Sequence, residues 1–100
     1  SDAKLKENVT DASPKLEDLM QVKVRNFNYI GDDKKQLGVV AQELEEILPE
    51  VVTLAAIDDP ANYKTVKYEK MVPLLIEAIK ELTEQNMEMK QRLDKLEGEA

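Results

Sequence analysis

The chain has 100 residues, enough for one small domain or for a smaller domain with an extended element. Its formal net charge of −7 argues against a nucleic-acid partner. No apolar run approaches the roughly 18 residues of a membrane span, and no signal peptide is visible, so no membrane partner is expected. Cysteine and histidine are both absent, which removes disulfides, thiol chemistry and the usual zinc ligands. We therefore expect no metal and no other cofactor, and any catalysis must use hydroxyls, carboxylates or a lysine amine.

The segment from Ser13 to Met20 predicts a short helix. Ser13 is a suitable N-cap, and Pro14 suits the first helical position. Glu17 and Asp18 would then lie at the positive end of the helix dipole.

A β-hairpin is predicted next, with one strand at 22–30, a polar turn at 31–35 and a return strand at 36–40. The apolar side chains of the first strand change parity part-way along: Val22, Val24, Phe27 and Tyr29. We expect a β-bulge near Arg25 or Asn26, because it would turn all four to the buried side.

The following apolar residues have helical spacing, namely Leu44, Ile47 and Leu48, and Pro49 ends the run. Two short strands are predicted after this helix, at Val51–Leu54 and Tyr63–Tyr68, with a loop at 55–62 that contains Asp58, Asp59 and Pro60. These elements predict an α+β globular part that spans residues 1–71.

A heptad pattern fills the rest of the chain, at 72–100, and predicts a long helix with Pro73 in its first turn. One position of the pattern is polar, Asn86, which occupies an a position and favours control of register over strength. From Val72 to Leu96 such a helix spans roughly 38 Å, and alone it would be marginal in water. Association with other copies along this stripe is favoured over a helix that folds back on its own domain. The residues do not separate dimer from trimer. We call the following eight residues the seam: Val72, Leu75, Ile79, Leu82, Asn86, Met89, Leu93 and Leu96.

The first residues, SDAKLKENVTD, place Ser1 five positions before Lys6. A serine hydroxyl becomes a nucleophile when a neighbouring base takes its proton, and a lysine amine can be that base. Such a lysine must be partly buried or set among cations, because its reference pKa of ~10.4 keeps it protonated at neutral pH. By itself this spacing favours a solvated N-terminal arm, because a serine and a lysine five residues apart occur by chance in most proteins.

Three stretches in a fixed order add a more specific signal: SDAKLKENV, LGVVAQELEEILPEVV and YKTVKYEKMVPLLIEAIKEL. In this combination the chain resembles a self-cleaving family of Ser/Lys autoproteases. Members are the C-terminal intramolecular chaperone domains of phage tailspikes, tail fibres, neck appendages and endosialidases. The resemblance runs from Ser1 to about Leu82.

The resemblance implies that the precursor is cut just before Ser1, so that the chain shown is the released product. It implies Ser1 as the nucleophile and Lys6 as the base, with Asp2 and Asn8 close to the scissile bond. Gln42 and Glu43 are expected to support the site or the structure. Glu43 also belongs to a run of glutamates, which favours a charged helix face over a metal site.

The expected function is therefore that of a homotrimeric chaperone for a β-rich fibre or tailspike upstream in the same polypeptide. It would act in the cytoplasm of the infected bacterial host during virion assembly and would leave the mature fibre after cleavage. The alternative is a non-catalytic coiled-coil oligomerisation or adaptor module, in which Ser1 marks only a cloning boundary.

Overall fold

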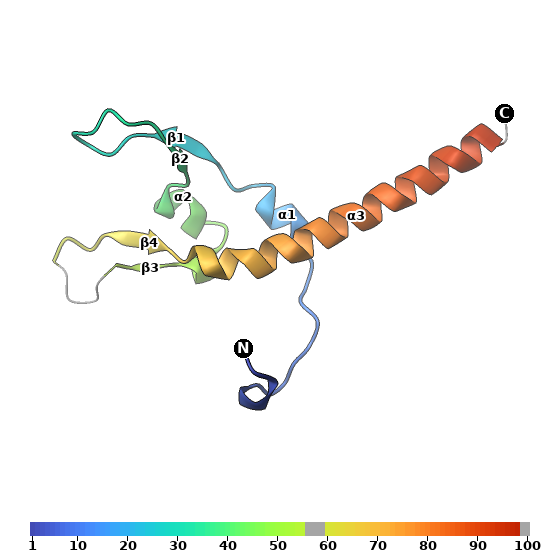
Figure 1. Cartoon of the computed structure of the whole chain (residues 1–100), viewed down its shortest axis with the longest axis horizontal. Helices are drawn as coiled ribbons and strands as arrows, with labels where there is room; N and C mark the ends of the chain where they lie inside the picture. The colour runs from blue at the N-terminus through green and yellow to red at the C-terminus, as the bar shows by residue number, and fades with distance from the viewer. Residues whose placement is uncertain (56–59, 99–100) are drawn as a thin grey trace.

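Two β-hairpins and three helices make up the chain in a computed structural model that describes residues 1–55 and 60–98 (Figure 1). The layout is α+β, as the sequence predicts. The molecule is elongated, with extents of 66 × 44 × 21 Å and a radius of gyration of 19.4 Å. A compact domain of this length has a radius of gyration of about 13 Å. The elements are η1 (Ala3–Leu5), α1 (Leu16–Leu19), β1 (Arg25–Phe27), β2 (Gln36–Gly38), α2 (Ala41–Glu45), η2 (Pro49–Val51), β3 (Val52–Leu54), β4 (Lys64–Val66) and α3 (Tyr68–Gly98).

The core is small and centred on α2 and η2, where Leu44, Leu48 and Val51 are fully buried. The predicted helix through Pro49 is shorter than expected, because the Leu44 carbonyl accepts from the N–H groups of both Ile47 and Leu48 at 3.0 and 2.8 Å. This tightens the chain after α2, and Pro49 begins η2 instead. Partly buried hydrophobic side chains surround the centre: Leu19, Val22, Val39, Ile47, Val52, Val66, Met71 and Leu74.

The first hairpin pairs β1 with β2 in antiparallel register, with Asn26 opposite Leu37. The predicted β-bulge is wrong, since the three paired positions follow one another without an extra residue. Only three residues of the strand are paired, so Tyr29 leaves the sheet and its ring packs edge-on against Phe27, with centroids 5.3 Å apart. Gly38 leaves room for the Phe27 ring, because a Cβ there would lie 3.1 Å from it.

The second hairpin pairs β3 with β4, with Thr53 opposite Thr65. Both strands were predicted, but β4 ends at Val66 and Tyr68 belongs to α3. The loop expected at 55–62 is only partly described, because residues 56–59 lie outside the described part of the chain.

Helix α1 begins later than predicted, at Leu16, and Ser13 is not its N-cap. The N–H groups of Lys15 and Leu16 donate to Glu81 Oε2, at 2.7 and 3.2 Å. A carboxylate from α3 thus replaces the local cap, and the Ser13 hydroxyl accepts from Lys15 Nζ at 3.1 Å.

Helix α3 begins earlier than predicted, at Tyr68, so that Pro73 lies inside it and not in its first turn. A proline there removes one backbone hydrogen bond of the helix. Tertiary packing offsets this loss, because Met71, Leu74 and Ala78 contact the body of the domain. Beyond Glu81 the helix leaves the body, and residues 82–98 are all exposed (Figure 1).

Candidate functional site

The N-terminal segment contains one short turn that is held by Asp2. Its carboxylate accepts from the Lys4 N–H at 2.8 Å, and its carbonyl accepts from the Leu5 N–H at 3.1 Å. The Lys6 N–H closes the turn on the Ala3 carbonyl at 3.1 Å. Ser1 and Lys6 therefore flank a single 3-10 turn, η1, that Asp2 caps.

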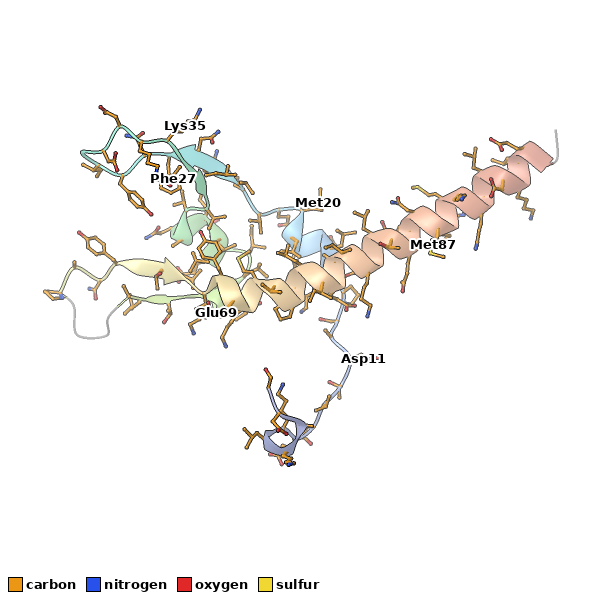
Figure 2. All side chains as sticks on the ribbon, viewed as in Figure 1. Asp11, Met20, Phe27, Lys35, Glu69 and Met87 are labelled. Carbon is orange, nitrogen blue, oxygen red and sulfur yellow. The ribbon has the colours of Figure 1, made fainter. Side chains whose placement is uncertain are left out.

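This segment stands clear of the rest of the molecule (Figure 2). Residues 1–14 are all exposed, and Asn8 has a positive φ of 55°, which turns the chain sharply after the turn. Among the described hydrogen bonds and ion pairs, none joins Ser1 to Lys6. The structure thus brings the predicted Ser1, Asp2, Lys6 and Asn8 into one segment without assembling a serine–lysine pair. Lys6 is exposed here, whereas a lysine base must be partly buried or set among cations.

The predicted supporting residues lie elsewhere, on α2. Glu43 forms a two-pronged ion pair with Arg25 of β1, in which Nε donates to Oε1 at 3.0 Å and Nη2 to Oε2 at 2.7 Å. The hydrogen bond from Arg25 holds the pKa of the Glu43 carboxyl below its usual value. Glu43 therefore ties the first hairpin to α2, and Lys64 of β4 ties the second hairpin to α2 through Glu45. Both contacts are structural and neither reaches Ser1.

Gln42 is exposed and lines an open hollow of about 400 Å³ between the two hairpins. Aromatic side chains form part of its wall, among them Phe27 and Tyr68. The glutamates of α2 do not converge: in the described part of the chain, no three acidic side chains lie close enough to hold a metal ion.

Helix α3 has two neighbouring apolar faces, and each residue of the first face directly precedes a residue of the second in the sequence. Met71, Leu74 and Ala78 pack on the body, and Ala78 is only 6% exposed. The seam, in contrast, is uncovered, with apolar side chains from 47% exposed at Leu75 to 67% at Met89. The helix does pack on its own domain, as one of the two sequence-based alternatives expected, but it does so through a different face. No described helix is long and apolar enough to cross a lipid bilayer.

Residues 1–53 match the model of the peptidase S74 family, which is described as chaperone of endosialidase. The chain belongs to this family. The matched range contains all six site residues predicted outside the seam: Ser1, Asp2, Lys6, Asn8, Gln42 and Glu43.

The chain is also similar to long tail fibre proteins Gp37 of enterobacteria phages. It is 33% identical over 98 residues to the proteins of phages K3 and T2, and 31% identical over 97 residues to that of phage M1. These alignments cover 93% of the chain for K3 and T2 and 90% for M1. The chain spans 8% and 7% of the K3 and T2 proteins and 38% of the M1 protein.

Two features of the site were not predicted from the sequence. Glu81 lies 65 and 66 positions after the N–H groups that it binds, so no local pattern marks it. The body-facing stripe of α3 was visible in principle, because Met71, Leu74 and Ala78 follow a three-then-four spacing of their own.

Proposed function

We propose that this chain is the C-terminal intramolecular chaperone of a phage tail fibre. In this proposal three copies associate along α3, align the upstream fibre segments of the same polypeptides, and are released by self-cleavage just before Ser1. Family membership and the likeness to long tail fibre proteins support the class of client. The uncovered seam of α3 is the observation that carries the assembly step.

A parallel arrangement of the helices fits the residues that flank the seam. Identical Asn86 side chains then share one layer and can hydrogen-bond to one another, while an antiparallel pair would set each against a leucine or methionine. Arg92 and Glu97 occupy g and e positions five residues apart, where opposite charges on neighbouring parallel chains face each other. Parallel helices place the three globular parts, and the three N-terminal segments, at the same end of the assembly.

The need for such an assembly follows from the folding of long intertwined β-structured fibres. Their pairings join residues far apart in sequence or on different chains, so folding is slow and exposed to misassembly. A C-terminal trimer holds the three chains in register at a high effective concentration. When the trimer has left, the fibre stays kinetically trapped, because the element that aligned the chains is gone.

The proposed cleavage uses two side chains of the N-terminal segment. Lys6 takes the proton of the Ser1 hydroxyl, whose oxygen attacks the carbonyl carbon of the preceding residue. The peptide bond to the Ser1 nitrogen breaks and the nitrogen receives the proton, which leaves an ester on the Ser1 oxygen. Water then hydrolyses this ester to a fibre carboxylate and a free Ser1 hydroxyl. The events would occur in the cytoplasm of the infected bacterium during virion assembly.

The proposal is tested on a precursor that carries its natural upstream segment. Ser1→Ala should give uncut, full-length trimers, whereas the matched control Ser13→Ala should be cut normally. Lys6→Ala should be cut far more slowly, and Lys6→Arg should not restore the rate, since arginine stays protonated. Gel bands and the mass of the new N-terminus are the readout. Normal processing of Ser1→Ala at the same bond contradicts self-cleavage, and an uncut wild-type precursor favours the non-catalytic adaptor.

A further inference from the structure

Glu81 links α3 to the start of α1, where the N-terminal segment ends. Its Oε2 accepts from the N–H groups of Lys15 and Leu16, at 2.7 and 3.2 Å, and all three groups are partly buried. Hydrogen bonds to a charged acceptor are about twice as strong as neutral ones. This carboxylate therefore holds the chain at the point where the exposed segment joins the body.

The other hydrogen bonds described for residues 1–14 are local. They stay within the turn that Asp2 caps or join Ser13 to Lys15 two positions on. The direction in which the segment leaves the body thus depends on α1, which packs against α3, and on Glu81. Without the contact to Glu81, the backbone at Lys15 and Leu16 would be less constrained, and residues 1–14 would take a wider range of orientations relative to the body.

Glu81 directly precedes a seam residue in the sequence, although its own side chain lies on the body-facing side of α3. Leu82 is a seam residue, whereas Ala78, one turn before Glu81, is buried against the body. Association through the seam would fix α3 relative to its neighbours and, through Glu81, would fix the point from which each N-terminal segment departs. One side chain thus connects the assembling face to the segment that bears Ser1 and Lys6.

We infer that Glu81 is a positioning residue for cleavage, which transmits assembly along the seam to the placement of Ser1 and Lys6. This inference rests on the proposed function. Glu81 touches neither reacting group and acts through the backbone of Lys15 and Leu16. Loss of positioning by a distant group can slow a reaction by about 10- to 100-fold, because reacting atoms must be held within bond-forming reach.

The test compares three variants of the precursor with its upstream segment. Glu81→Ala removes the acceptor, and Glu81→Gln keeps an acceptor oxygen in the same place without the charge. Glu84→Ala is the matched control, since it removes the same charge from an exposed position three residues further along α3. Assembled trimers are isolated first, and the rate of cleavage before Ser1 is measured for each assembled trimer. Amide hydrogen exchange at Lys15 and Leu16 is measured on the same samples.

We expect Glu81→Ala to slow cleavage by at least about tenfold in trimers that are already assembled. Exchange at the two amides should rise, Glu81→Gln should recover most of the rate, and Glu84→Ala should match wild type. A purely structural role would change the yield of trimers but not the rate in trimers once formed. Cleavage of Glu81→Ala within twofold of wild type, or unchanged amide exchange, overturns the inference alone. If the wild-type precursor is not cut at all, the proposed function itself fails.

Discussion

The two apolar faces of α3 differ in what covers them. One face packs Met71, Leu74 and Ala78 on the small core and ends at Glu81, where the body ends. The other face, the seam, starts beside the first at Val72 and continues to Leu96, and its apolar side chains are exposed in the single chain. The second half of α3 extends beyond the body (Figure 1). The difference indicates that α3 completes the domain with one face and is available for association with the other.

The small core makes this difference important for stability. Four hydrophobic side chains are buried among the described residues: Leu44, Leu48, Val51 and Ala78. Chains of this size bury a smaller fraction of their surface than larger domains, and many gain stability by association. An isolated helix as long as the exposed half of α3 is marginal in water. Association along the seam would supply the burial that one chain lacks.

The largest expected effect is on the seam itself. Replacing Ile79 and Leu82 together by aspartate should abolish association, because unpaired charges would meet inside the assembly. The control places the same side chain on the outer face of α3, with Lys80→Asp and Gln91→Asp, and should leave the assembly in place. Size-exclusion chromatography with light scattering gives the mass. If the variant with aspartate at both Ile79 and Leu82 had the same mass as the wild-type assembly, the chains would associate through another surface.

Two adjacent leucines separate the two faces. Leu74→Ala should lower the free energy of unfolding of the body by roughly 2 kcal/mol, because it removes partly buried methyl groups from the core. Leu75→Ala should instead weaken association, with little effect on the body. Denaturant unfolding below and above the concentration at which the chains associate distinguishes the two. Equal effects of both variants on the body would mean that the two faces are not independent.

A smaller effect is expected at Asn86, the polar residue of the seam. Asn86→Ile should raise the melting temperature by about 5 °C for each kcal/mol gained, while it relaxes copy number or register. Calorimetry together with mass measurement reports both changes. If Asn86→Ile melts at a lower temperature than the wild type, Asn86 does more than set the register, and its amide makes a stabilising contact.

The smallest expected effect concerns the ion pair of Glu43 with Arg25, which lies on the surface of the body. The hydrogen bond from Arg25 lowers the folded-state pKa of Glu43, so its contribution is present above the unfolded-state pKa and is lost as pH falls through the folded-state pKa. The free energy of unfolding should therefore fall less between neutral pH and about pH 3 in Glu43→Gln than in the wild type. Glu46→Gln is the control. Identical pH profiles for wild type and Glu43→Gln would contradict a link between the first hairpin and α2.

The sequence predicted the elements that a repeated pattern marks. It was misleading where a single tertiary contact determines where an element begins. The long helix, the first hairpin and the two strands of the second hairpin were predictable, because heptads and apolar strand patterns mark them locally. The start of α3 was misplaced because proline favours a first turn, and packing of Met71 on the core outweighs that preference. Ser13 was expected to cap α1, but Glu81 does so from far along the chain. The helix propensities of neighbouring residues cannot predict a contact with a residue so far along the chain.

The candidate site shows the same contrast. Ser1, Asp2, Lys6 and Asn8 are neighbours in the sequence, and Asp2 caps the turn between Ser1 and Lys6, but no hydrogen bond or ion pair joins Ser1 to Lys6 in the described part of the chain. Glu43 was expected to support the site or the structure, and its contact with Arg25 on the first hairpin is a structural one. A strand that reaches α2 only in the folded domain could not be anticipated from neighbouring residues.

The seam is tested most directly by sedimentation equilibrium of the chain on its own. The uncovered seam predicts association, and the threefold number comes from the family resemblance. We therefore expect three times the mass of one chain at hundreds of micromolar. A monomer throughout this range would contradict association along the seam. A clean dimer would contradict the threefold assembly on which the proposed chaperone role depends.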